Sequence, residues 1–290
     1  MRCGLSVFKD IVLYLRMIKF SHSVFALPFA FTSALIAADG VPALRQVFWI
    51  TVAMVGARTG AMGFNRIIDR DIDALNPRTE ERELPAGRIS FRAALTLSII
   101  SFAVLALAAY RLNPLCFKLT PVAIAVVVLY SYTKRFTWAS HFVLGLALSA
   151  APLGAWLAVG GKFVAGAFFP ALAVLFWIAG FDILYALQDM EFDKSRGLHS
   201  IPAKLGIRNS IFLSRFLHLL SWDFLVFTGI IFGLGFYYWA GLIVAAALFI
   251  YEHAIIKADD LSRLNKAFFN MNGYISITVF LFTLLNYISK

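Results

Sequence analysis

The sequence predicts an all-α membrane protein that crosses the bilayer nine times. Of its 290 residues, 61% are hydrophobic and only 14% are charged, and the mean hydropathy is +0.80. Soluble domains carry roughly 45–50% apolar and 25% charged residues, so a soluble globular enzyme is excluded. The apolar residues form continuous runs such as 121–130, whereas a β-barrel would show short alternating segments.

Each predicted span is an apolar block close to the length that crosses the hydrocarbon core, about 20 residues. The nine blocks lie at residues 22–38, 47–67, 93–110, 114–131, 138–160, 165–189, 210–235, 237–256 and 269–288. Arg16 and Lys19 precede the first block as in a signal peptide, but the later spans and the lack of a cleavage site favour a retained helix. No low-complexity tract interrupts the chain, which predicts a single membrane domain over residues 1–290.

The basic residues predict which side of the membrane each loop occupies. Most of the 26 lysines and arginines lie in the amino terminus and in the loops that follow even-numbered spans. The positive-inside rule places these segments in the cytoplasm, as in a multi-pass protein of the inner (plasma) membrane. This topology and anionic lipid explain the net charge of +10, so no nucleic-acid partner is expected.

Acidic residues are concentrated at the ends of the second and sixth spans, which hold most of the 16 in the chain. At about 100° per residue, Asn65, Asp69 and Asp73 share one helical face. The sixth span has the same kind of face, formed by Asp182, Tyr185, Asp189 and Asp193. Stacked carboxylates at a helix C-terminus repel one another, so these two faces indicate a bound cation.

Oxygen ligands without a nearby histidine or cysteine suit Mg²⁺, which commonly bridges to a substrate phosphate. Two opposing acidic faces would hold two or more Mg²⁺ ions and a diphosphate. For the other acids of these segments, salt bridges to nearby arginines are the favoured interpretation. This group consists of Asp71, Glu80, Glu81, Glu83 and Glu191.

A diphosphate leaving group also needs cationic donors, and three basic residues are candidates. Arg66 directly follows Asn65, and Lys134 and Arg135 end the fourth span in a segment that begins at Tyr130. For Lys134 and Arg135, anchoring of the span at the membrane surface is an equally supported alternative.

These motifs resemble those of the UbiA-type superfamily of membrane aromatic prenyltransferases. The family's Asn-xxx-Asp-xxx-Asp motif is matched by Asn65, Asp69 and Asp73. Its Asp-xx-Tyr-Ala-xx-Asp-xxx-Asp motif is matched by Asp182, Tyr185, Ala186, Asp189 and Asp193. The likeness extends over residues 130–135, 151–154 and 265–269, and therefore over nearly the whole chain.

The resemblance implies nine helices around a central cavity, with cytoplasmic cap loops after the second and sixth spans. It implies that Mg²⁺ is held by Asp69, Asp73, Asp189 and Asp193. It also implies that Asn65, Arg66 and Lys134 contact the diphosphate of a polyprenyl diphosphate, that Tyr185 lies in the cavity, and that Asp182 organises the metals or takes a proton. Diphosphate departure would give an allylic cation, which the ring of a phenolic aromatic acid attacks.

The acceptor acid is expected to be 4-hydroxybenzoate, as in ubiquinone biosynthesis, or 1,4-dihydroxy-6-naphthoate, as in the futalosine route to menaquinone. The Lys19-xx-His22 pattern resembles a branch whose members include enzymes thought to use the naphthoate. Lys19, His22 or Arg58 could pair with the acceptor carboxylate, and Arg58 is the strongest candidate because an arginine within a span needs a partner or water. For His22 an interfacial polar role is equally supported. A secondary transporter, or a prenyltransferase for haem, chlorophyllide or homogentisate, remains an alternative.

Overall fold

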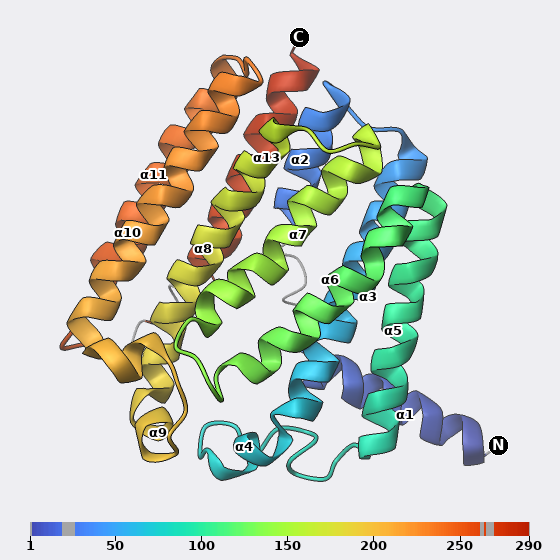
Figure 1. Ribbon diagram of the computed structural model, residues 1–290, viewed down its shortest axis with the longest axis vertical. Helices are drawn as coiled ribbons and strands as arrows, with labels where there is room; N and C mark the ends of the chain where they lie inside the picture. The colour runs from blue at the N-terminus through green and yellow to red at the C-terminus, as the bar shows by residue number, and fades with distance from the viewer. Residues whose placement is uncertain (1, 19–26, 262–263, 265–269, 290) are drawn as a thin grey trace. The chain divides into compact units, whose positions relative to one another are not determined.

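Helices form the regular structure of the chain in the computed structural model, which describes residues 2–18, 27–261, 264 and 270–289 (Figure 1). No strand occurs among these residues. Lys19 and His22 lie outside them, as do residues 265–269. The chain divides into one unit of residues 1–23 and 49–132 and a second unit of residues 24–48 and 133–290.

The first unit is built on three long apolar helices and two shorter ones. Its elements are α1 (Arg2–Met17), most of α3 (Leu44–Ile68), α4 (Arg70–Leu75), α5 (Phe91–Leu112) and α6 (Pro114–Thr133). Small residues let α3 approach α5 closely, because a Cβ atom at Gly56 would lie only 2.8 Å from the carbonyl oxygen of Ser101. Ser90 caps α5 by accepting a hydrogen bond from the backbone N–H of Ala93.

The second unit is built around its most buried helix, α8. Its elements are α2 (Leu27–Ala38), α7 (Ser140–Gly160), η2 (Ala165–Ala167), α8 (Phe168–Ala186), η3 (Leu187–Asp189), α9 (Met190–Ser195), α10 (Ile201–Ile231), α11 (Phe236–Ile255) and α13 (Asn272–Ile288). The α8 helix packs against α7 and α10. Its Trp177 is buried and donates an indole hydrogen bond of 2.8 Å to Asn272 Oδ1 of α13.

Seven of the helices that the structure describes are long and apolar enough to cross a membrane. These candidate spans are Leu44–Ile68, Phe91–Leu112, Pro114–Thr133, Ser140–Gly160, Ala165–Ser195, Ile201–Ile231 and Phe236–Ile255. Large apolar side chains such as Leu44, Phe212 and Phe236 are exposed on them, as expected for contact with lipid. The chain is therefore an integral membrane protein, and the predicted all-α class is confirmed.

The first and ninth predicted spans correspond to α2 and α13, which are apolar but shorter than the other seven. The nine-span topology therefore stays a prediction. The seventh span also differs, because α10 begins at Ile201, nine residues before the predicted start. Ser200 caps that helix and Pro202 occupies its first turn, while Gly206 interrupts it at a φ of 75°.

Candidate functional site

The first acidic motif forms where α3 ends and the chain turns into α4. Asp69 has φ −91° and ψ 3°, outside the helical range, and separates the two helices. The backbone bonds from Asp69 N to Asn65 O and from Asp73 N to Asp69 O, 2.9 and 2.7 Å long, continue across the break. Asn65, Asp69 and Asp73 thus remain one turn apart, and all three are buried.

The side chains of this motif contact one another. Asn65 Nδ2 donates to Asp69 Oδ2 at 3.2 Å and to Ser131 Oγ of α6 at 3.3 Å. The structure therefore brings the end of α6, where Tyr130 lies, to the motif. Arg66 Nη1 lies 3.5 Å from Asn65 Oδ1 and 3.9 Å from Asp73 Oδ2, so this predicted diphosphate-binding residue joins the cluster.

Arg82 completes the first motif. Its Nη1 donates a 2.7 Å bond to Asp73 Oδ2, and both side chains are largely buried. The sequence predicted salt bridges for the other acids of these segments and not for Asp73. The structure shows that Asp73 forms one as well. A salt bridge to an arginine is confirmed for Glu81, which pairs with Arg88 at 2.8 Å at the surface. Glu191 pairs instead with a lysine, Lys194, at 3.1 Å.

Arg58 lies farther along α3 from the acidic motif. Its position seven residues before Asn65 places it on the same helical face, about 10 Å away along the helix axis. The residue is half-buried and has interaction partners. It is therefore the basic group of the predicted set that lies deepest within α3.

The second acidic motif has a corresponding backbone break in the second unit. The α8 helix ends at Ala186, and Asp189 has φ −103° and ψ 2° before α9 begins. Asp182 therefore belongs to the long helix, while Asp193 belongs to the short one. The loop that follows Asp193 is joined to Lys134 by a 2.8 Å bond from His199 N to Lys134 O.

His141 is a functional candidate that the sequence interpretation missed. Its Nδ1 lies 2.7 Å from Asp182 Oδ2, and its Nε2 accepts a 3.2 Å hydrogen bond from the backbone N–H of Ile201. Because Nε2 is an acceptor, Nδ1 carries the proton and donates to the carboxylate. His141 thus fixes Asp182 and also ties α7 to the first residue of α10. An isolated histidine near the start of an apolar block was the only signal in the sequence.

The donor set of each motif suits Mg²⁺ bound in one particular way. The first motif offers the carboxylate oxygens of Asp69 and Asp73, a chemistry that a hard ion prefers, and the Asn65 amide steadies Asp69 by donating to its Oδ2 at 3.2 Å. Within the described residues, no three His, Cys, Asp or Glu side chains converge on a common metal position. Mg²⁺ typically uses one or two carboxylates together with water and substrate phosphates, and the residues present fit that mode.

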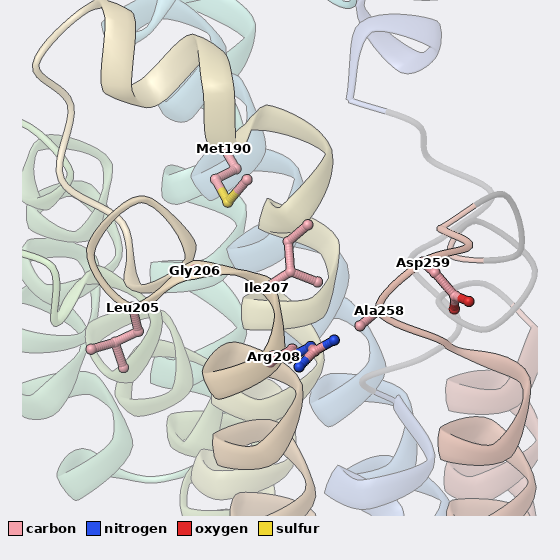
Figure 2. A pocket seen from close by; sticks show the side chains of 7 residues that line it. All are labelled: Met190, Leu205, Gly206, Ile207, Arg208, Ala258 and Asp259. Atoms are coloured by element: carbon pink, nitrogen blue, oxygen red, sulfur yellow. The ribbon is translucent and has the colours of Figure 1, made fainter.

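A separate pocket of about 650 Å³ opens beside α9 (Figure 2). Met190, Gly206, Arg208 and Asp259 are among the residues that line it, and none of the predicted site residues does. Tyr185 and Arg135 are also absent from its lining; both are half-buried in the second unit. The pocket is therefore distinct from the two acidic motifs.

Polar residues of α10 and α11 lie apart from the two acidic motifs in the sequence. Three of these residues form a cluster in the second unit, with His253 Nε2 2.9 Å from His218 Nδ1 and Glu252 Oε2 3.6 Å from the same atom. The Glu252 side chain is only 1% exposed, so it does not face water at the helix end. Packing of α11 against α10 encloses it.

The chain is similar to known proteins over most of its length. Residues 26–274 match the UbiA prenyltransferase family. A 4-hydroxybenzoate octaprenyltransferase of Pseudomonas fluorescens is 34% identical over 257 residues, which cover 87% of this chain and 84% of that protein.

Two solved structures share the fold. A UbiA homologue from Aeropyrum pernix superposes with a TM-score of 0.84 at 30% identity, covering 91% of this chain and 98% of that chain. A UbiA homologue from Archaeoglobus fulgidus bound to DMAPP and Mg²⁺ superposes with a TM-score of 0.70 at 21% identity, covering 96% of this chain and 99% of that one.

Proposed function

Because this chain belongs to the UbiA prenyltransferase family, we propose that it transfers a polyprenyl group from a polyprenyl diphosphate to the ring of 4-hydroxybenzoate in respiratory quinone biosynthesis. The observation that carries this proposal is the buried cluster of Asn65, Arg66, Asp69 and Asp73 at the break between α3 and α4. The name of the Pseudomonas fluorescens relative supports the choice of acceptor.

The proposed architecture is a single domain of nine transmembrane helices around a central cavity, with the loops after α3 and α8 as cytoplasmic caps. The seven long apolar helices and the apolar α2 and α13 are consistent with it. The excess of basic residues in one set of loops supports an inner-membrane protein whose active site faces the cytoplasm.

The two acidic motifs are proposed to act on one diphosphate. Asp69, Asp73, Asp189 and Asp193 hold Mg²⁺ in this proposal. The diphosphate is bound by Asn65, Arg66, Tyr130, Lys134 and Arg135. The Archaeoglobus fulgidus homologue, whose structure contains DMAPP and Mg²⁺, supports the choice of ion.

The residues of the chain have separate tasks in the reaction. When bound, Mg²⁺ withdraws charge from the diphosphate oxygens. Arg66 and Arg82 supply positive charge as the allylic C–O bond breaks and its electron pair leaves with the diphosphate. Apolar helix surfaces exclude water, which would otherwise capture the allylic cation, and Tyr185 offers a ring face to that cation.

The acceptor must be held with a ring carbon against the cation. Arg58 pairs with its carboxylate, at a depth of about 10 Å from Asn65 along α3. The new C–C bond takes two electrons from the ring, and loss of the ring proton restores aromaticity. Asp182, oriented by the hydrogen bond from His141, is the proposed acceptor for this proton.

The test is prenyl transfer by purified protein from farnesyl diphosphate to 4-hydroxybenzoate and, in parallel, to 1,4-dihydroxy-6-naphthoate. We expect Mg²⁺-dependent product that is lost in Asp69→Asn and Asp189→Asn. Asp71→Asn is the matched control, because Asp71 is exposed on the opposite side of the same motif and should retain activity.

The outcomes separate the alternatives. Formation of product only with 1,4-dihydroxy-6-naphthoate would show that this acid is the acceptor and that the reaction is still prenyl transfer. An equal loss of activity in Asp71→Asn would contradict a specific role for the buried face of the motif. Absence of both transfer and diphosphate binding would contradict an enzyme and favour the transporter.

A further inference from the structure

The amphipathic helix α1 has a position and a charge distribution that no step of the proposed reaction uses. In the first unit it runs across the ends of α3 and α5 rather than alongside them (Figure 1). A helix that crosses membrane spans at their ends lies near the plane of the bilayer surface.

One face of α1 packs against its own unit. Tyr14, Met17 and Ile18 are buried in a cluster with Leu84 and Ile89 of the loop after α4. The Tyr14 hydroxyl donates to the carbonyl of Thr59 at 3.0 Å and lies 2.9 Å from Ser98 Oγ. Burial raises the pKa of Tyr14, so the hydroxyl keeps the proton that it donates.

The other faces of α1 are exposed and are of two kinds. Ile11 and Leu15 are 39% and 37% exposed and lie about 40° apart around the helix axis. Lys9 and Arg16 are exposed, lie about 20° apart and are centred about 130° around the helix from Ile11 and Leu15. An exposed apolar face combined with a separate basic face is the pattern of helices that sit in the headgroup region of an anionic leaflet.

The inner end of α1 reaches the first acidic motif. Arg66 Nε donates a 3.4 Å hydrogen bond to the backbone carbonyl of Met17. The same part of α1 packs on Leu84, two residues after Arg82. A shift of α1 would therefore move contacts of both arginines near Asp73.

We propose that α1 is an interfacial helix that binds anionic lipid headgroups through Lys9 and Arg16, and that its seating on the bilayer positions Arg66. The positioning of Arg66 rests on the proposed function, in which Arg66 binds the diphosphate of the substrate. Lipid with an anionic headgroup should then improve the binding of the prenyl diphosphate without changing the chemistry.

The position of α1 relative to the bilayer is tested first, by a measurement that does not depend on enzymatic activity. A fluorophore is attached at Leu15→Cys in protein whose Cys3 and Cys116 are replaced by serine, and the protein is reconstituted in vesicles containing doxyl-labelled lipid. We expect strong quenching at this position and little at Glu80→Cys, an exposed loop residue of the same unit. Equal, weak quenching at both positions would overturn the interfacial placement.

The coupling between lipid binding by α1 and diphosphate binding is tested by enzyme kinetics in vesicles of phosphatidylcholine with and without phosphatidylglycerol. We expect the anionic lipid to lower KM for farnesyl diphosphate several-fold with kcat within about twofold, and K9Q/R16Q to abolish the difference. R111Q/K118Q removes the same charge from exposed positions on α5 and α6 and should keep the response.

An active enzyme with the same KM in both lipids would overturn the coupling, as would an undiminished response in K9Q/R16Q. An inactive wild-type protein would instead contradict the proposed function, and the quenching result would still decide where α1 lies.

Discussion

Asp73 is buried and its charge is balanced by Arg82, which comes from a loop nine residues farther along the chain. Arg82→Gln would leave this carboxylate with only the longer 3.9 Å contact to Arg66 Nη1, and removal of one partner of a buried pair costs up to about 3–5 kcal/mol. We expect a lower Tm for Arg82→Gln in detergent with EDTA, and a smaller loss with Mg²⁺ and pyrophosphate present. The double variant Asp73→Asn/Arg82→Gln should recover part of the stability, because position 73 then carries no charge that needs a partner. Additive losses would contradict the pairing.

His141 has two tasks that can be separated by substitution. His141→Leu removes both the donor to Asp182 and the acceptor for Ile201 N–H, and we expect kcat to fall about 10–100-fold. Glutamine also offers one donor and one acceptor, so His141→Gln should retain most of kcat. Steady-state kinetics with purified variants makes the comparison. Equal loss in both variants would show that the hydrogen-bond pattern is not what matters.

The residue scale also shows what local sequence could predict. Spacing predicted Asn65, Asp69 and Asp73 as a group because the three are separated by single helical turns. Arg82 and His141 could not be matched to Asp73 and Asp182 in the same way, because Arg82 lies in the loop after α4 and His141 on α7, while their partners lie on α4 and α8. Such pairs depend on the tertiary packing of separate elements, which the periodicity of the sequence does not predict.

At the scale of elements, the contact between α3 and α5 depends on residues without side chains. A Cβ at Gly56 would meet the backbone of Ser101, which has no room to move, so Gly56→Ala should destabilise the protein by about 1–3 kcal/mol. Gly154 in α7 has open space around it, and Gly154→Ala should be neutral or slightly stabilising. Thermal unfolding in one detergent compares them. A larger loss in Gly154→Ala would contradict the close-approach argument.

Element boundaries were predicted less well than element type. Hydropathy placed the seventh span at residue 210, but α10 starts at Ile201 because Ser200 and Pro202 form a helix start that is less apolar than the span itself. The breaks at Asp69 and Asp189 also escaped prediction, since neither residue is a glycine or a proline. Apolar length identifies a span, whereas its ends are determined by local capping and backbone geometry.

At the scale of the whole molecule, the prediction concerns ligand binding. Because no cluster of three metal ligands exists within the described residues, Mg²⁺ alone should bind weakly and raise Tm little. Mg²⁺ with pyrophosphate should raise Tm more than the two separate effects combined, since the phosphate oxygens complete the coordination. Asp69→Asn and Asp189→Asn should each remove the extra stabilisation. A large shift with Mg²⁺ alone would indicate a preformed metal site instead.

The imidazole of His141 also limits how this protein can evolve. One ring nitrogen must accept from a backbone N–H while the other donates to a carboxylate, at a buried position between α7, α8 and α10. Lysine and arginine can only donate, glutamate when ionised can only accept, and aliphatic residues do neither. Genetic drift at this position should therefore be confined to histidine and a residue with a neutral side-chain amide, while neighbouring lipid-facing positions exchange freely among apolar residues.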